Sequence, residues 1–349
     1  MKRDAMLLVD ALRDPASTAA LDAQGWTALI AMARAEQLIG TLAHRLRFES
    51  VPRKVLEILA DARTNAEYQR RSALWEAECA ARALADYPGK VVLLKGTAYV
   101  AAGLKAAEGR HIGDLDIMVA REDLPQVEAS LLEKGGWEWV KEDAYDDAYY
   151  RDHMHELPPL IHKERDRMID VHHTILPLTA RPKPFPATMM DLAVELPDGL
   201  WTLMPEHMVL HSAAHLIADG DLSGGLRNLW DIHCLVTEFS GQQDDFCLSL
   251  AEEAALHGLS QPVNRALRLS RELFGTELKS YSYPMTVNYG WNRQDKWYIR
   301  RLTARDEWGR PKRKLTRLAF YIRSHWLRMP PLMLARHLFT KWRKAKARP

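Results

Sequence analysis

The sequence predicts an α+β fold, in which a small mixed β-sheet with its own helices is flanked by helical regions on the N-terminal and C-terminal sides. Residues 5–86 keep the apolar spacing of helices throughout. From Lys90 onward, short apolar runs alternate with helical patterns, which indicates a sheet with connecting helices. After a proline-rich stretch at 177–186, helical spacing returns as far as about residue 274.

Length and composition fit about two or three packed domains. The chain has 349 residues, of which 47% are hydrophobic, and this is ample for buried cores. Its cysteines, Cys79, Cys234 and Cys247, are far apart and odd in number, so neither a disulfide framework nor a metal-binding spacing is expected. No apolar run approaches the roughly 20 residues of a transmembrane helix. We therefore expect a cytoplasmic protein, at most peripheral at the inner face of the membrane.

Residues 1–88 are expected to form an N-terminal helical region. Apolar residues recur at helical spacing from Trp26 to Ala33, and the segment 54–87 holds neither glycine nor proline before Pro88 ends it. No pattern in this region points to chemistry, so we expect it to pack against the core or to shape a substrate site.

Residues 89–180 are expected to form a nucleus of strands and helices. The apolar periodicity predicts strands at 91–94, 115–119, 137–141, near 153–162 and at 167–173, and helices at 97–107 and 122–134. The polar residues 163–166 indicate a hairpin turn between the last two strands. This hairpin places Asp170 on a strand next to the one that carries Asp114 and Asp116.

Beyond a proline-marked linker, residues 200–280 are expected to form a helical bundle that opens at Pro205. Residues 281–349 form a basic tail rich in aromatic residues. This tail holds 18 Lys or Arg and three Asp or Glu, so the first 280 residues carry a net charge of −13. The tail can dock on the acidic body, meet an anionic membrane surface, or bind nucleic acid, although no specific nucleic-acid module is recognised. Docking would bury three of its aromatic residues, Trp326, Phe339 and Trp342.

Asp114 and Asp116 are the most informative residues of the chain. One residue apart on a strand, they point to the same face. Two adjacent anions are costly unless a divalent cation neutralises them. Asp170, at the centre of the alternating run 168–172, supplies a third carboxylate. We expect the three carboxylates to converge on a shared metal, and Asp116→Asn to leave stability unchanged or raised because it relieves repulsion. The alternative is a solvated strand end without a metal.

Lys95, Gly96 and Thr97 follow a buried strand and open a helical pattern, a geometry suited to phosphate binding. Gly96 lets the backbone approach a phosphate, Thr97 offers a hydroxyl, and Lys95 offers a point charge. Arg110 is a candidate phosphate or substrate clamp. Two alternatives remain open: Lys95 as a surface lysine, and Arg110 in an ion pair with one of the aspartates at 114 and 116.

Four polar residues of the expected bundle have helical spacing. His211 and His215 lie at i and i+4, and we expect them to line the cleft that faces the sheet or to pack within the bundle, with a metal site as the alternative. Arg227 and Asp231 have the same spacing and are expected to form an intrahelical ion pair. The alternative is that Arg227 reaches a phosphate group.

In this order and on these elements, the motifs resemble the DNA polymerase β-type nucleotidyltransferase superfamily, and within it an uncharacterised bacterial nucleotidyltransferase family. The residues that carry the resemblance are Lys95-Gly96-Thr97, Arg110, Asp114-Leu115-Asp116, Ile169-Asp170-Val171-His172 and the helical stretch 203–231. It covers about residues 20–240. The chain departs from the superfamily pattern by having Thr97 where a second small residue is usual, and by a longer gap between Gly96 and Asp114.

The resemblance implies a Mg²⁺-dependent (or Mn²⁺-dependent) enzyme that moves a nucleoside monophosphate from a nucleoside triphosphate, such as ATP, to a hydroxyl acceptor. The acceptor is unidentified and can be a small molecule, a sugar-linked compound or a protein. By resemblance, Asp114 and Asp116 bridge two metal ions, and Asp170 holds one of them or acts as the general base. The alternatives are a non-catalytic nucleotide-binding or interaction protein and an antitoxin-like protein adenylyltransferase.

Overall fold

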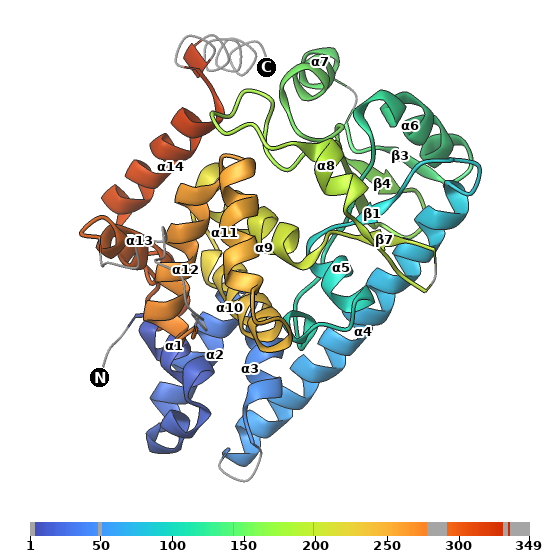
Figure 1. The fold of residues 1–349 in the computed structure, drawn as a ribbon. Helices are drawn as coiled ribbons and strands as arrows, with labels where there is room; N and C mark the ends of the chain where they lie inside the picture. The colour runs from blue at the N-terminus through green and yellow to red at the C-terminus, as the bar shows by residue number, and fades with distance from the viewer. Residues whose placement is uncertain are drawn as a thin grey trace, which may run out of the picture.

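The computed structural model describes residues 4–47, 51–141, 143–197, 199–277, 292–330 and 334–335. It confirms the predicted α+β fold, because one mixed seven-stranded sheet is accompanied by many helices (Figure 1). None of the helices in the described part of the chain is long and apolar enough to cross a membrane.

The sheet has the strand order β3-β4-β5-β2-β1-β7-β6. Its strands are β1 (Val92–Leu93), β2 (Leu115–Met118), β3 (Trp137–Trp139), β4 (Leu160–His162), β5 (Met168–His172), β6 (Val194–Glu195) and β7 (Trp201–Thr202). The pairs β2·β5 and β1·β7 are parallel, and the others are antiparallel. The predicted hairpin at 163–166 is confirmed, since it joins the antiparallel strands β4 and β5.

Several predicted boundaries are wrong. Helix α5 (Lys95–Ala101) begins earlier than expected and is followed by the separate turn η3 (Lys105–Ala107), because Gly103 between them has a positive φ of 67°. The strand expected near 153–162 is confined to β4, since α7 (Ala144–His153) and two prolines precede it. The short strands β6 and β7 were not predicted, and they extend the sheet beyond β1.

The N-terminal region is helical, as predicted. It contains α1 (Met6–Arg13), α2 (Ala23–Ala35), α3 (Ile39–Arg45) and α4 (Arg53–Ala83). The 31-residue helix α4 runs diagonally along the sheet in Figure 1 and contacts α3, α5, β2 and α6 (Leu124–Glu133). Its buried residues Ala66, Ala73, Ala77 and Ala80 are small, which lets neighbouring elements approach closely.

A helical bundle packs on the side of α5 and η3 that faces away from α4 (Figure 1). It consists of α9 (Pro205–Ala213), a π-helical turn (Ala214–Asp219), α10 (Gly225–Gln242), α11 (Phe246–Leu256) and α12 (Ser260–Phe274). Pro205 lies in the first turn of α9, as predicted. Buried apolar side chains form one continuous core from the N-terminal helices through the sheet to this bundle. The expected domain boundaries stay a prediction.

Two helices of the basic tail, α13 (Asp295–Leu302) and α14 (Lys314–Arg328), pack on the bundle. The rings of Tyr298 and Phe320 meet edge to face, 5.1 Å apart. Trp326, expected to be buried if the tail docks, is 48% exposed, so docking buries only one side of α14. Phe339 and Trp342 lie outside the described residues.

Candidate functional site

The structure brings together the three aspartates that the sequence singles out. Strands β2 and β5 are parallel neighbours, and their register sets Asp116 directly opposite Asp170. Asp114 precedes β2 by one residue and therefore faces the same side as Asp116. One carboxylate oxygen from each of the three lies within 4.8 Å of the others.

Asp116 is buried at the centre of this cluster and has two cationic or proton-donating neighbours. The Nζ atom of Lys95 lies 2.5 Å from its Oδ1 atom, and His172 donates a hydrogen bond from Nε2 to the same oxygen over 3.0 Å. Burial alone would raise the pKa of Asp116, but Lys95 and His172 outweigh it and hold this pKa well below its usual range. Asp116 is therefore ionised at any physiological pH.

Asp170 has the opposite electrostatics. Burial, followed by the nearby carboxylates of Asp116 and Glu156, raises its pKa to about 7. The cluster thus holds more negative charge than Lys95 compensates. Carboxylate oxygens at this spacing are the ligands that hard divalent cations such as Mg²⁺ prefer, and the donor set fits such an ion.

Lys95 reaches Asp116 from an unusual backbone conformation. Its φ of 50° lies in the left-handed region, which residues other than glycine adopt rarely and at a cost. The strain falls at the first residue of α5, directly beside the aspartates. Burial would lower the pKa of Lys95, but Asp116 and Asp114 raise it above its usual value, so the side chain stays charged. Because its ammonium group contacts the buried Asp116, the alternative of a lysine that only faces solvent at a strand end is wrong.

A second cluster of polar residues, which was not predicted from the sequence, adjoins the three aspartates. Glu156 bridges to His172 in the sheet, and its Oε2 atom lies 3.5 Å from Nε2 of His155 and 3.6 Å from Nε2 of His172. The Nδ1 atoms of both histidines are buried and have no hydrogen-bond partner in the part of the chain that the structure describes. Burial lowers the pKa of His155 far below its usual value, so this ring is neutral. No sequence signal pointed to Glu156, because it lies in an irregular segment outside any motif.

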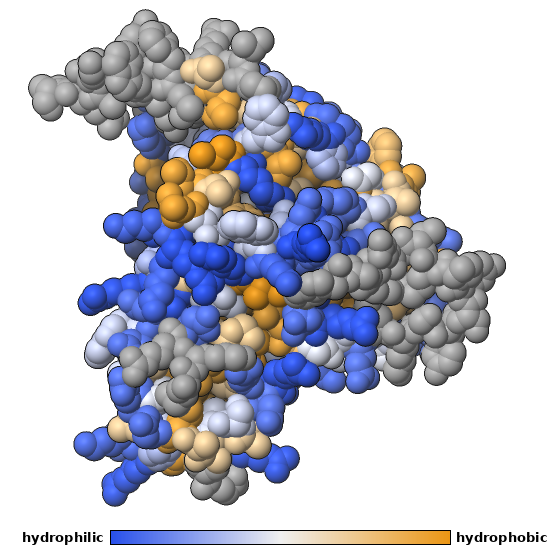
Figure 2. Space-filling view, turned by 90° about the vertical axis from the view of Figure 1, so that its left-hand side faces the viewer, coloured by the Kyte–Doolittle hydropathy of each residue, from blue (hydrophilic) through white to orange (hydrophobic). Residues whose placement is uncertain are grey.

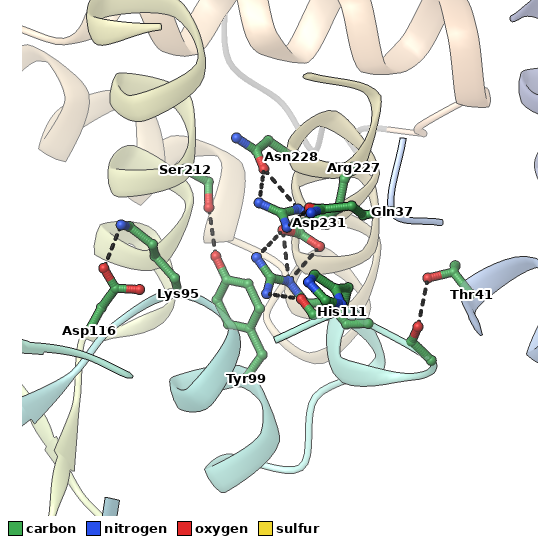
Figure 3. Close-up of polar contacts among 12 residues, drawn as sticks. Gln37, Thr41, Lys95, Tyr99, His111, Asp116, Ser212, Arg227, Asn228 and Asp231 are labelled. Atoms are coloured by element: carbon green, nitrogen blue, oxygen red, sulfur yellow. Dashed lines mark hydrogen bonds and ion pairs between the residues drawn. The ribbon is translucent and has the colours of Figure 1, made fainter. Parts of the chain in front are cut away.

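A cavity of about 200 Å³ opens beside the aspartates and extends to the bundle. The sheet side supplies Lys95, Asp114 and Asp116, and α10 supplies Arg227, Asn228 and Asp231. Figure 3 shows Lys95 and Asp116 apart from the α10 residues, with Tyr99 and Ser212 between them. The hydroxyl groups of Tyr99 and Ser212 share a 2.6 Å hydrogen bond. The cavity therefore has an anionic end at the sheet and a cationic end at α10.

Arg110 does not pair with Asp114 or Asp116, the partners expected for it as a structural residue. Its guanidinium is buried and contacts both carboxylate oxygens of Asp231, with Nε 3.1 and 3.0 Å away and Nη2 3.0 Å from Oδ2. Burial would lower the pKa of Arg110, but Asp231 raises it. This bidentate pair joins the loop before β2 to α10, so Arg110 acts mainly as a brace between sheet and bundle.

Gly96 makes room for that brace. A Cβ atom at this position would lie 2.1 Å from Nη1 of Arg110, closer than any real contact. The expected role of Gly96 in admitting a phosphate is thus accompanied by a packing role. Thr97 is 1% exposed, does not line the cavity, and its hydroxyl has no partner among the described residues. Its expected contribution of a hydroxyl to phosphate binding stays a prediction.

The expected intrahelical pair of Arg227 and Asp231 is also wrong, because Asp231 faces Arg110. Arg227 instead donates to the side-chain oxygens of Gln37 and Asn228. Among the described residues, no carboxylate lies within ion-pair distance of its guanidinium. Burial, and then repulsion from Arg110, lowers the pKa of Arg227. A guanidinium nevertheless keeps its charge in proteins, so the cavity wall carries a positive charge with no ion-pair partner among the described residues.

His211 and His215 line the cavity, which agrees with the interpretation favoured from their spacing. His215 belongs to the π-helical turn, an irregularity that is frequent at functional sites. Burial and the neighbouring Lys95 lower the pKa of both rings, that of His215 to about 3. They are neutral and suited to hydrogen bonding. Neither belongs to the clusters that could hold a metal in the described residues.

Another cluster, His207, Glu253 and His257, has the composition of a metal site but the wrong proton arrangement. The backbone N–H of Phe185 donates to Nδ1 of His257 over 3.0 Å, so the neutral ring carries its proton on Nε2. That nitrogen faces Glu253, 3.4 Å away, and cannot bind a metal while protonated. The cluster is best explained as a structural hydrogen-bond group in the bundle.

Comparison with known proteins identifies a family for most of the chain. A family model described as "Uncharacterised nucleotidyltransferase" matches residues 22–275, well over half of the chain. The match spans the aspartates, Lys95, Arg110 and the bundle. Among curated proteins, none matches the chain.

Proposed function

The chain belongs to the family of uncharacterised nucleotidyltransferases, and we propose on this basis that it moves a nucleoside monophosphate from a nucleoside triphosphate to an acceptor hydroxyl. The observation that carries the proposal is the convergence of Asp170 with Asp114 and Asp116, two aspartates that line one end of a cavity whose other end holds Arg227. A triphosphate would suit both ends, because the carboxylates would hold its divalent cation while phosphate oxygens that the cation leaves free would meet the guanidinium of Arg227. The order of the motifs supports a DNA polymerase β-type site.

The three aspartates would hold Mg²⁺ or Mn²⁺. When bound, such ions neutralise charge on the phosphates and make the acceptor oxygen a better nucleophile. The residues around the aspartates position them for this role. His172 fixes the orientation of the Asp116 carboxylate, and Glu156 adds negative charge beside Asp170.

Asp170 suits proton transfer as well as metal binding. A base is most effective when its pKa lies near the working pH, and burial raises the pKa of Asp170 to about 7. With a divalent cation held beside it, this pKa would fall again, so Asp170 would then be ionised and able to accept the proton of an acceptor hydroxyl. Asp170 would therefore act either as a metal ligand or as the general base.

Lys95 and Arg227 are the proposed cationic contacts of the triphosphate. Lys95 lies on the aspartate side, where its ammonium group can release Asp116 and contact a phosphate oxygen when substrate binds. Arg227 lies across the cavity and is held by neutral amide oxygens, so its charge is available for an anion. Backbone groups at Gly96 face the same cavity, and Arg110 supports the site through Asp231.

Release of pyrophosphate tests the proposal. The wild-type chain, each of the four common NTPs, Mg²⁺ or Mn²⁺ and fractionated cell extract should yield pyrophosphate and a labelled acceptor. Asp114→Ala should abolish both products, whereas Asp61→Asn, an exposed aspartate on α4, should leave them unchanged. The acceptor's class, whether small molecule, sugar-linked compound or protein, follows from the labelled product.

A different outcome supports the other class of function. If a triphosphate binds at micromolar concentration in a metal-dependent way and no extract provides an acceptor, the chain is better described as a nucleotide-binding or interaction protein. A labelled protein would instead favour a protein adenylyltransferase.

A further inference from the structure

Helix α14 has two unlike faces. Thr316, Phe320 and Ser324 recur every four residues and are buried against the body. The other face exposes an apolar stripe of four residues, Leu315 (83% exposed), Leu318 (54%), Ile322 (57%) and Trp326 (48%). Their spacing of three, four and four residues keeps them on one side of the helix. We call these four residues the α14 stripe.

The body holds α14 firmly, so the stripe is a fixed feature. Phe320 packs edge to face on Tyr298 of α13. Arg323 donates a 2.7 Å hydrogen bond to the carbonyl of Ile217 in the π-helical turn, and Thr179 donates to the carbonyl of Arg328 at the end of the helix. Figure 2 faces this side of the molecule, where exposed apolar surface lies among hydrophilic side chains. The helix therefore lies along the body with its apolar side outward.

Positive charge borders the stripe. Lys314 is exposed one turn before Leu318 of the stripe, and Arg317 is exposed on the neighbouring side of the helix. From Trp308 to the last residue, the sequence contains 13 Lys or Arg and no Asp or Glu. An apolar stripe next to basic residues without acidic ones is the pattern of a helix that lies in the interface of a membrane with anionic headgroups.

We propose that the α14 stripe and its basic border bind an anionic lipid bilayer, with α14 parallel to the membrane plane. The aliphatic side chains would enter the headgroup region, Trp326 would lie at the boundary to water, and Lys314 and Arg317 would contact lipid phosphates. Nucleic acid fits less well, because an exposed Leu and Ile stripe offers nothing to a phosphate backbone. This binding is independent of the nucleotidyl transfer proposed above.

Vesicle flotation with the full-length protein tests the proposal. Binding is expected to vesicles of phosphatidylcholine with phosphatidylglycerol, to be weak on phosphatidylcholine alone, and to fall at high salt because screening shortens the reach of surface charges. Leu318→Ser with Ile322→Ser should reduce binding about tenfold or more, and Lys314→Glu with Arg317→Glu should do the same. Matched controls are Leu256→Ser, an equally exposed leucine on α11, and Lys54→Glu, an exposed lysine on α4; both should bind like wild type.

Three results would overturn the proposal. The first is equal binding by all variants, and the second is no binding to anionic vesicles at low salt. The third is a concentration-dependent dimer in size-exclusion chromatography that the stripe variants lose, because the stripe would then be an interface between two copies. Circular dichroism and unaltered nucleotide binding show that the variants remain folded, so loss of vesicle binding can be read directly.

Discussion

Arg110 and Asp231, 121 residues apart in the sequence, form a buried bidentate ion pair between the loop before β2 and helix α10. The pair fixes the distance between the anionic end of the cavity and the helix that carries Arg227. Gly96 packs against the guanidinium of Arg110, so the segment proposed to bind phosphate and the brace depend on each other. The position of the sheet relative to the bundle is therefore set by the same residues that line the candidate site.

Gly96→Ala should destabilise the protein because of this packing. The added methyl group would overlap with Arg110, which Asp231 holds in place, and overpacking of this kind costs about 1–3 kcal/mol. Urea unfolding measures this decrease in the free energy of unfolding. The control is Gly241→Ala in α10, where a Cβ atom meets nothing within 4 Å and stability should stay equal or rise. Equal effects of the two substitutions would contradict the packing role of Gly96.

Asp116→Asn should destabilise the protein, contrary to the expectation from the sequence that it relieves repulsion. The sequence did not reveal that Lys95 lies 2.5 Å from this carboxylate, and the substitution leaves the half-buried ammonium group without its nearest partner. We expect the free energy of unfolding to fall by about 2–3 kcal/mol, less than for a fully buried ion pair, because Lys95 is partly exposed. Thermal unfolding compared with Asp61→Asn measures it, and an unchanged or higher midpoint would restore the earlier expectation.

Asp170→Asn should stabilise the metal-free protein at high pH. The pKa of Asp170 is raised to about 7, so the folded state keeps a proton that the unfolded chain loses near pH 4. This proton contributes its full stabilisation of the folded state below about pH 4, and the contribution is lost as the pH rises to about 7. At about pH 8 the variant should therefore exceed wild type by about 1–3 kcal/mol, and at about pH 4 the two should be equal.

Unfolding of both proteins in EDTA across this pH range measures the difference. Mg²⁺ should then raise the midpoint of wild type more than that of Asp170→Asn, because a metal ion binds the native carboxylate cluster. A stability difference that does not change with pH would exclude the raised pKa of Asp170.

Arg227→Ala should weaken binding of a nucleoside triphosphate about tenfold or more, the usual effect of losing a charged hydrogen bond. Binding of the corresponding monophosphate should change little, because Arg227 is proposed to contact the terminal phosphates. Stability should also change little, since the guanidinium contacts only neutral amide oxygens among its described partners. Calorimetric titration with both nucleotides measures the ratio of the dissociation constants of variant and wild type. Arg53→Ala on α4 is the control. Equal weakening for both nucleotides would place Arg227 elsewhere in the site.

Features that depend on neighbouring residues could be predicted from the sequence. Alternation along a strand puts Asp114 and Asp116 on one face, and a polar turn at 163–166 makes the hairpin that carries Asp170 to the adjacent strand. Pro205 and the glycine-free segment 54–87 likewise located the bundle and α4. Such signals are local, because backbone geometry fixes them over a few residues.

Contacts between distant segments were decided by the tertiary structure alone. The partner of Arg110 could have been any of several aspartates, and packing of α10 against η3 selected Asp231. The same packing left Arg227 without a carboxylate and turned it into the cavity, while Glu156 reached the site through a single bridge to His172. The charges and pKa values of the site arise from burial and from neighbours far away in the sequence, and residue spacing carries no information about either.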